Sequence, residues 1–236
     1  MRSPSLRYDL VSFDLDGTLV DTAAEIAEAV NLALADHGIA PRPQAEITAL
    51  IGPGTKELML RLLARILIEQ PVLAPSVRPD AVLASMDRHY ALTTGSAARP
   101  YDGCVDALQA LQQAGLRLAC VTNKEAHHAR RVLEVTGLKD FFDLVVGGDS
   151  LPEKKPHRNV LLHVAANLGC AVSRCAHVGD SVTDVEAARN AGFAAWAVPY
   201  GYNAGVPIAE CRPARIFGRL AEIAGHVLAG QEQVAA

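Results

Sequence analysis

The amino-acid sequence predicts an α/β protein, with a parallel-sheet core and a small helical cap domain inserted after the first strand. Short apolar runs alternate with segments whose apolar residues recur at helical spacing, as in parallel sheets whose faces are covered by helices. The alternation is interrupted once, between residues 21 and 98, by successive helical patterns without a convincing strand. These two observations together favour a sheet domain that carries a helical insertion.

The elements of the core are predicted from these runs in chain order. Apolar runs place strands at residues 10–13, 116–121, 144–146, 175–178 and 194–198. Apolar residues at helical spacing place helices at residues 105–114, 126–136, 160–168 and 185–191. In such a sheet, ligands bind in the crevice outside the carboxyl ends of the strands, so the residues that follow each strand are the first candidates for a site.

The inserted segment is predicted to form four helices, at residues 23–36, 44–50, 56–69 and 79–92. Thr22 and Glu25 have the spacing of a capping box for the first of them. The turn-forming run Pro100-Tyr101-Asp102-Gly103 marks the return to the sheet. We therefore assign residues 1–20 and 99–236 to the α/β core and residues 21–98 to the helical cap domain.

Composition narrows the class of protein. The chain has 236 residues, half of them hydrophobic, and a formal net charge of -4 with scattered lysines and arginines, which argues against nucleic acid or an anionic membrane as a partner. The most apolar segment, residues 58–68, contains Arg61 and Arg65, and no signal-peptide pattern opens the sequence. Five widely spaced cysteines without a Cys-x-x-Cys pair indicate free thiols. We expect a cytoplasmic monomer or homodimer that acts on a small molecule.

The most informative motif is Asp14-Leu15-Asp16-Gly17-Thr18, directly behind the first predicted strand. Side chains two residues apart on a strand emerge on the same side, so the two carboxylates can share one hard cation. Mg²⁺ binds carboxylates, water and phosphate oxygens, and Gly17 allows a sharp turn. Taken alone, the motif is equally compatible with an Asx turn in a loop.

Two further strand ends or helix starts offer groups that could hold a phosphate. Thr122 and Asn123 follow the second predicted strand, where a hydroxyl and main-chain N–H groups can bind an anion. Thr122 and Glu125 could instead form a capping box. Lys155 lies in the loop before a predicted helix, where it either neutralises a phosphate or is solvated.

A third group of polar residues follows the strand predicted at residues 175–178. Asp180 comes directly after Gly179, at the same edge of the sheet, and is a candidate Mg²⁺ ligand. Ser181 and Asp184 have the spacing of a capping box, so Asp184 either starts the next helix or supports the metal and phosphate ligands from behind.

Several patterns point elsewhere. The run Gly52-Pro53-Gly54-Thr55-Lys56 lacks the spacing of a phosphate-binding loop and is predicted to be a cap-domain turn that faces the substrate. His127 and His128 are neighbours on a predicted helix, about 100° apart, and are expected to be poor partners for one metal ion. His177 is expected to be a hydrogen-bonded core residue. The sequence has no Gly-x-Ser-x-Gly motif, which disfavours a serine hydrolase.

In order along the chain, four of these motifs resemble the four motifs of the haloacid dehalogenase superfamily: Asp14-Leu15-Asp16-Gly17-Thr18, Val121-Thr122-Asn123, Lys155-Pro156 and Gly179-Asp180-Ser181. The resemblance spans nearly the whole chain and implies a Rossmann-like core with a small four-helix cap. Gly147-Gly148-Asp149-Ser150, Glu153-Lys154-Lys155-Pro156-His157 and Tyr200-Gly201-Tyr202-Asn203 are most similar to phosphoglycolate phosphatases. One departure is Arg158, where that group commonly has proline.

The resemblance implies a role for each motif residue. Asp14 would attack phosphorus and form an aspartyl-phosphate, and Asp16 would be the general acid and base. Thr122 and Lys155 would hold the phosphoryl oxygens, with Asn123 also in the substrate site. Mg²⁺ would be bound by Asp14, by the main-chain carbonyl of Asp16 and by Asp180. Asp184 would support Asp180 or Lys155 from behind.

The resemblance also implies a Mg²⁺-dependent phosphatase for a small phosphorylated metabolite, with 2-phosphoglycolate as the leading substrate. The cap turn at Gly54, Thr55 and Lys56 could recognise the carboxylate of this substrate, or it could equally be a tight turn between helices with a solvated lysine. Three alternatives remain open: a capped phosphatase for sugar or nucleotide phosphates, a phosphotransferase similar to β-phosphoglucomutase, and a phosphate-sensing protein without turnover.

Overall fold

The computed structural model describes residues 7–229 and contains a six-stranded parallel sheet. The strand order is β5-β4-β1-β6-β7-β8, so β1 pairs with strands that come much later in the chain. The strands are β1 (Leu10–Phe13), β4 (Arg117–Val121), β5 (Leu144–Val146), β6 (Cys175–Gly179), β7 (Ala194–Ala197) and β8 (Arg215–Ile216). The carboxyl ends of β1, β4 and β6 therefore lie side by side, at the edge of the sheet where the sequence analysis places the motif residues.

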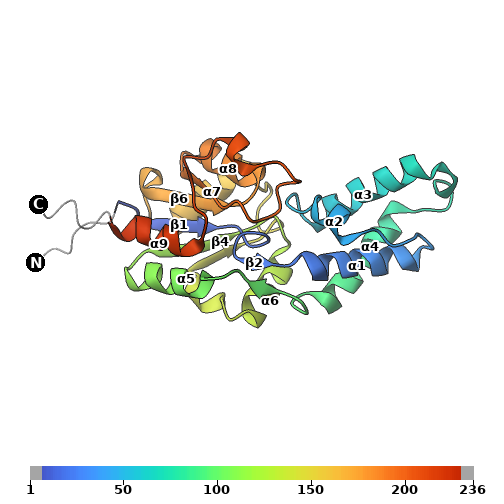
Figure 1. Ribbon diagram of the computed structural model, residues 1–236, viewed down its shortest axis with the longest axis horizontal. Coiled ribbons are helices and arrows are strands. Elements are labelled where there is room, and N and C mark those ends of the chain that lie inside the picture. Colours follow the sequence, from blue (N-terminus) through green and yellow to red (C-terminus); the bar gives the residue numbers. More distant parts are fainter. Residues whose placement is uncertain (1–6, 230–236) are drawn as a thin grey trace, which may run out of the picture.

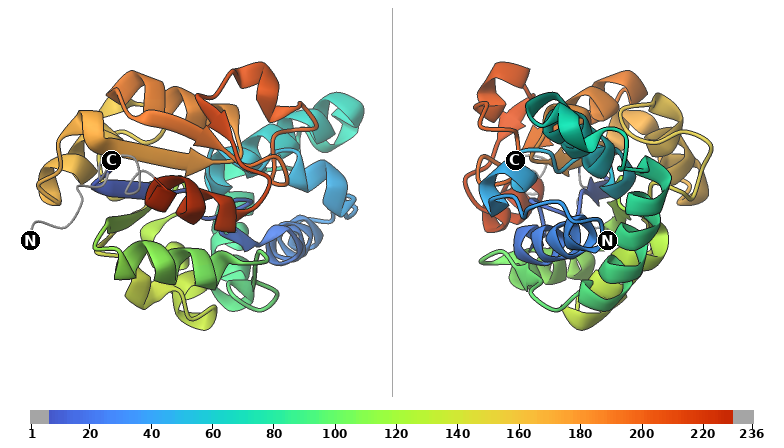
Figure 2. Two further views of the ribbon diagram at one scale, coloured as in Figure 1. Left: turned by 60° about the vertical axis from the view of Figure 1, so that its left-hand side comes forward. Right: turned by 90° about the vertical axis from the view of Figure 1, so that its right-hand side faces the viewer.

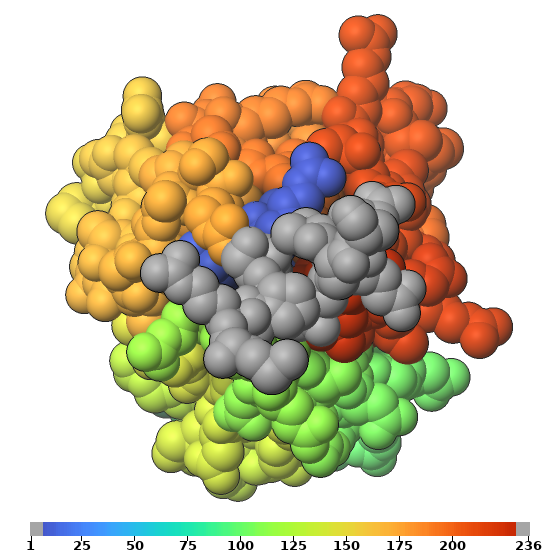
Figure 3. All heavy atoms as spheres, turned by 90° about the vertical axis from the view of Figure 1, so that its left-hand side faces the viewer, coloured from blue at the N-terminus to red at the C-terminus, as the bar shows by residue number. Residues whose placement is uncertain are grey.

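Helices cover both faces of this sheet. Figure 2 shows the sheet between two layers of helices. On one face lie α5 (Cys104–Gln113), α6 (Ala126–Val135) and α9 (Leu220–Ala229), and on the other lie α7 (Arg158–Asn167) and α8 (Val182–Ala191). Strand side chains alternate between the faces: Val11 and Phe13 pack with the first layer, whereas Leu10 packs with the second. Figure 3 views the core from the end away from the cap, where the chain enters β1.

The inserted helices form a second body with its own core. They are α1 (Ala23–Asp36), α2 (Gln44–Thr48), α3 (Thr55–Glu69) and α4 (Pro79–Thr93), and they lie beyond the carboxyl edge of the sheet (Figure 1). Their apolar faces pack together in a cluster that includes Ile26, Val30, Leu62, Ile66 and Tyr90. This cluster is separate from the two that flank the sheet.

A short antiparallel ribbon joins the two bodies, and no sequence pattern predicted it. Strand β2 (Val20–Asp21), where the chain leaves the core, pairs with β3 (Arg99–Pro100), where it returns. The ribbon holds the entrance and exit of the cap together, at the two positions where the sequence analysis divides the chain.

The remaining elements are short. In the part of the chain that the structure describes, four 3₁₀ helices are found, at Pro71–Leu73, Lys139–Phe141, Val172–Arg174 and Ile208–Cys211. Between residues 7 and 229, no helix combines the length and the apolar character needed to cross a lipid bilayer. All five cysteines are free thiols, as the sequence predicts.

Candidate active site

Asp14 and Asp16 lie just beyond β1, at the centre of the sheet's carboxyl edge. The main-chain N–H of Asp14 donates to the carbonyl of Val178 at 2.9 Å, which extends the pairing of β1 with β6 by one residue. Gly17 then turns the chain with a φ of +82°. A Cβ atom there would lie 2.5 Å from Oδ2 of Asp180, so only glycine allows the two loops to approach this closely.

The carboxylate of Asp16 is held by two donors. The hydroxyl of Thr22 and the ammonium of Lys124 each donate to Oδ1 at 2.6 Å. Lys124 is buried, and the ring of Tyr90 from the cap helix α4 lies 5.1 Å from its Nζ. Burial opposes the charge of Lys124, yet the neighbouring Asp16 carboxylate holds its pKa well above the usual range. The sequence analysis missed Lys124, although it directly follows Thr122-Asn123.

Lys155 lies behind Asp14. Its Nζ is 2.9 Å from Oδ1 of Asp14, and it donates to Oδ1 of Asp184 and to the carbonyl of Val121, each at 2.7 Å. Its side chain is only 2% exposed, which excludes the solvated alternative. Burial disfavours its charge, but the neighbouring carboxylates of Asp14 and Asp184 raise its pKa above the usual range, which favours the ammonium form.

Asp184 caps a helix and also contacts Lys155. It forms a capping box with Ser181 at the start of α8, because its Oδ2 accepts from the main-chain N–H and the hydroxyl of Ser181. Its Oδ1 contacts Lys155 and lies 3.4 Å from Nε2 of His177. Ser12 lies 2.9 Å from the other ring nitrogen of His177, which confirms that this histidine is a paired core residue.

Asp180 completes a group of three buried carboxylates. It accepts from the hydroxyl of Thr18 at 2.7 Å and from the main-chain N–H of Tyr202. Ligand oxygens of Asp14, Asp180 and Asp184 all lie within 4.8 Å of one another. The Asp16 carboxylate is not part of this group, because it points to Lys124 and Thr22.

The electrostatics of this group suit a divalent cation. Burial raises the pKa of Asp14 to about 6, even though Lys155 opposes the shift. Burial and repulsion from Asp184 and Asp14 raise the pKa of Asp180 well above its usual value. A hard cation bound to these oxygens would reverse both effects, and an all-oxygen donor set is what Mg²⁺ prefers.

Thr122 lies at the end of β4, where its main-chain N–H bonds to the carbonyl of Val146 at 2.9 Å. Its hydroxyl accepts from the N–H of Lys124 at 3.2 Å. The alternative capping box with Glu125 is not formed, because Glu125 is itself the residue before α6 and accepts a hydrogen bond from Thr55 of the cap. Thr122 therefore remains at the sheet edge that Asp14 and Asp16 share.

Asn123 connects the loops around the site. Its side-chain amide donates to the carbonyl of Gly52 at 3.1 Å and to the carbonyl of Lys155 at 3.0 Å. This places a cap loop and the Lys155 loop against the end of β4. Both amide hydrogens serve these carbonyls, so the structure gives Asn123 an organising role beside its expected place in the substrate site.

The cap turn at Gly52 to Lys56 lies directly on the core. The hydroxyl of Thr55 donates to the Glu125 carboxylate at 2.7 Å, and Nζ of Lys154 donates to the carbonyl of Pro53 at 2.6 Å. Gly54 has a φ of +101°, and a Cβ atom there would lie 2.8 Å from the carbonyl oxygen of Asn123. Gly54 is thus a point of closest approach between cap and core.

A cavity of about 20 Å³ lies between cap and core, lined by Asp14, Asp16, Ile26, Ile51, Gly52, Gly54, Thr55, Leu58, Thr122 and Lys124. It has room for roughly one water molecule, so the cap must move for a phosphomonoester to enter. Of the three cap residues expected to face the substrate, Gly54 and Thr55 line this cavity. Lys56 lines a neighbouring pocket of about 320 Å³ instead, which the structure places beside α4.

The capping box predicted for Thr22 and Glu25 is wrong. Thr22 precedes α1 but makes no side-chain cap bond, because its hydroxyl donates to Asp16. Glu25 is buried and accepts from the main-chain N–H groups of Gly95 and Ala97, at 2.9 and 3.3 Å. Neither side chain caps the helix: Thr22 binds Asp16 in the preceding motif, and Glu25 binds the distant segment at Gly95 and Ala97.

The chain is similar to known proteins over most of its length. The family model for haloacid dehalogenase-like hydrolases matches residues 8–192. The phosphoglycolate phosphatase of Thiobacillus denitrificans is 40% identical over 225 residues, which cover 95% of this chain and 97% of that protein. The phosphoglycolate phosphatase of Nitrosococcus oceani is 33% identical, with coverage of 91% and 94%.

Solved structures show the same fold. A protein from Haemophilus somnus, described as a predicted phosphoglycolate phosphatase, superposes with a TM-score of 0.86 at 32% identity and covers 93% of this chain and 98% of its own. The four motifs, the capped α/β fold and these relatives agree: the chain belongs to the haloacid dehalogenase-like hydrolases and is a phosphatase.

Proposed function

We propose that this phosphatase hydrolyses 2-phosphoglycolate to glycolate and inorganic phosphate, with Mg²⁺ as cofactor and Asp14 as nucleophile. The observation that carries the proposal is the arrangement of two carboxylates at one cavity. Asp14 is paired with Lys155, and Asp16 is held by Lys124 and Thr22. The substrate follows from the relatives named as phosphoglycolate phosphatases, which match nearly the whole chain.

In the first half-reaction, a carboxylate oxygen of Asp14 attacks phosphorus and the bond from phosphorus to the leaving oxygen breaks. Asp16, protonated at this stage, gives its proton to that oxygen as glycolate departs. Lys155 and Thr122 bind the oxygens of the transferring phosphoryl group. The product of this step is glycolate and an aspartyl-phosphate at Asp14.

In the second half-reaction, water attacks the phosphorus of the aspartyl-phosphate. Asp16, now ionised, takes a proton from the water, and the bond between phosphorus and Asp14 breaks. Inorganic phosphate leaves, and both aspartates return to their starting states. Lys124 and Thr22 would hold the Asp16 side chain in place during both steps.

Asp14, Asp180 and the main-chain carbonyl of Asp16 would hold Mg²⁺, and Asp184 would support the set through Lys155. The cation supplies positive charge that neutralises the carboxylates and the phosphoryl oxygens. An Asp180→Ala variant should therefore need a much higher Mg²⁺ concentration for half-maximal turnover. Unchanged Mg²⁺ dependence would remove Asp180 from the ligand set.

The carboxylate of the substrate would be recognised by the start of α3. Gly54 and Thr55 line the cavity, and the first main-chain N–H groups of a helix favour an anion. Lys56 follows on the same turn, and its side chain faces the neighbouring pocket. We propose that Lys56 contributes through its main chain in the closed arrangement.

A substrate screen tests this function. Purified protein would be assayed with 2-phosphoglycolate, a hexose phosphate and a nucleoside monophosphate, each with Mg²⁺ and with a chelator. We expect the highest kcat/KM for 2-phosphoglycolate, and no turnover with chelator or in Asp14→Asn. A clear preference for the hexose or nucleoside phosphate would overturn the substrate, and turnover by folded Asp14→Asn would overturn the mechanism.

A further inference from the structure

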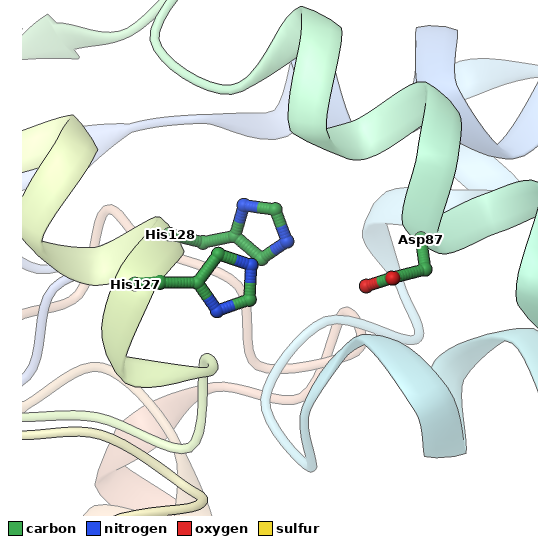
Figure 4. A group of neighbouring side chains, drawn as sticks. All are labelled: Asp87, His127 and His128. Carbon is green, nitrogen blue, oxygen red and sulfur yellow. The ribbon is translucent and has the colours of Figure 1, made fainter.

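A second group of possible metal ligands lies at the boundary between cap and core, away from the buried carboxylates. Asp87 on α4 faces His127 and His128 at the start of α6 (Figure 4). One ligand atom from each side chain lies within 4.8 Å of the other two. The sequence analysis expected the two histidines to be poor partners for one metal ion, because they lie about 100° apart on the helix, yet their ring centroids are only 3.8 Å apart.

The hydrogen bonds of His128 leave one ring nitrogen free for a metal. The hydroxyl of Thr94 donates to the carbonyl of Tyr90, so the oxygen of this hydroxyl is left to accept from Nδ1 of His128 at 2.8 Å. A neutral imidazole that donates from Nδ1 carries its lone pair on Nε2. A histidine whose other ring nitrogen donates in this way is oriented as metal-binding histidines are.

The other two side chains are available. Within residues 7–229, neither the Asp87 carboxylate nor the His127 imidazole takes part in a hydrogen bond or an ion pair, and both residues are exposed. Ligands of a tetrahedral ion lie about 3.4 Å apart when each bond is about 2.1 Å long. Exposed side chains can close the remaining gap by small rotations. The adjoining pocket of about 320 Å³ leaves room for a water molecule as fourth ligand.

We propose that Asp87, His127 and His128 form a binding site for a borderline transition-metal ion such as Zn²⁺, which bridges the cap to the core. Two imidazoles and one carboxylate match the ligand preference of Zn²⁺, whereas the all-oxygen group at Asp14 matches Mg²⁺. Asp87 belongs to the inserted helices and the two histidines belong to the sheet domain. One ion would therefore hold the cap closed.

The bridge has a consequence for turnover. The cavity beside Asp14 holds about 20 Å³ in the closed arrangement, so substrate enters and product leaves only when the cap moves. An ion that joins α4 to α6 opposes this movement. Zn²⁺ at this site should slow the phosphatase without occupying the Mg²⁺ ligands.

Binding is measured by equilibrium dialysis with Zn²⁺, on protein without a polyhistidine tag and with Mg²⁺ in large excess to occupy the carboxylates. We expect one tightly bound equivalent in the parent protein, and its loss in Asp87→Asn and in His127→Gln. Two matched controls, Asp80→Asn in the same pocket and His163→Gln on α7, should retain it. Equal binding by the parent protein and both ligand variants would overturn the site.

Two variants test whether Thr94 orients His128 and whether a bound ion joins the cap to the core. Thr94→Val should weaken Zn²⁺ binding by about 10–100-fold, because His128 loses the partner that orients it. Asp87→Asn should keep the Mg²⁺-dependent rate of the parent protein and lose the inhibition by one equivalent of Zn²⁺. Inhibition of the same depth in parent and variant would show that Zn²⁺ acts elsewhere and would overturn the bridge.

Discussion

The ammonium nitrogen of Lys124 lies 2.6 Å from Oδ1 of Asp16, and Lys124 is buried beside the ring of Tyr90 from the cap. The proposed acid–base residue is therefore held by a cation from the core, and that cation is covered by a cap helix. Thr22, at the entrance to the cap, bonds to the same oxygen. The position of Asp16 thus depends on both bodies of the protein.

Lys124→Met should slow turnover by about 100-fold, because a displacement of the acid–base group of about 1 Å has an effect of that size. The variant also loses the cation of the Asp16–Lys124 ion pair. Its free energy of unfolding should therefore fall by about 3 kcal/mol, the lower end of the range for breaking a buried pair. Steady-state kinetics and urea unfolding give the two values. Lys139→Met, at an exposed ion pair, is the matched control and should change neither.

Lys155→Met should be far more harmful than Lys154→Met. Lys155 is buried between Asp14 and Asp184, whereas Lys154 is partly exposed and bonds to the cap carbonyl of Pro53. Loss of Lys155 leaves two buried carboxylates without their cation, which should lower the free energy of unfolding by about 3–5 kcal/mol. It also removes a group that binds the phosphate. Inhibition by inorganic phosphate measures the second effect. If Lys154→Met weakened that inhibition more, the assignment of the phosphate-binding lysine would have to be exchanged.

Gly54→Ala should impair closure of the cap, and Gly52→Ala serves as its control. Both glycines have positive φ values, so alanine introduces backbone strain at either position. Only at Gly54 would the added methyl collide with the core, 2.8 Å from the carbonyl oxygen of Asn123, since nothing lies within 4 Å at Gly52. We expect a raised KM and lowered kcat for Gly54→Ala alone. Matching kinetics for the two variants would show that this contact does not limit closure.

The chelated protein should lose stability as pH rises through the titration of Asp14. Burial raises the pKa of Asp14 from 3.8 to about 6, so the folded state keeps a proton that the unfolded chain has already lost. The contribution of Asp14 to folding is thus most favourable below pH 3.8 and is lost as pH rises to about 6. Urea unfolding in chelator should show the parent protein losing stability relative to Asp14→Asn over this window. Parallel pH profiles would contradict the raised pKa.

The core strands and the motif loops could be predicted because their signals are local. The strands at residues 10–13 and 144–146 have the predicted bounds, and the other three predicted strands differ by one residue at an end. Helix α9 was missed even though Leu220, Ile223, Ala224 and Val227 have helical spacing. The ribbon of β2 and β3 has two residues on each side, too few to form a pattern.

The capping-box patterns show that local spacing alone does not decide which helix cap forms. Ser181 with Asp184, Thr22 with Glu25 and Thr122 with Glu125 share one spacing, yet only the first pair forms the box. In the other two pairs the glutamates accept from distant segments instead, Glu125 from Thr55 and Glu25 from Gly95 and Ala97.

The same reason explains why Lys124 was missed. A lysine after a strand is ordinary in sequence, and only the folded chain brings it to Asp16 and beneath Tyr90. Likewise, the spacing of His127 and His128 on a helix does not reveal that Asp87 lies opposite them.

The central claim, that Asp14 is the nucleophile, is tested most directly by locating the transferred phosphoryl group. Asp16→Asn protein would be mixed with Mg²⁺ and an aryl phosphate, whose leaving group departs without a proton, and then quenched in acid and digested. Because this variant lacks the base that activates water, the intermediate should accumulate. Mass spectrometry should find one phosphoryl group on Asp14 of the Asp16→Asn protein. The double variant that also carries Asp14→Asn should have none. Release of the aryl alcohol without a phosphorylated Asp14, or a phosphoryl group on another residue, would contradict the mechanism.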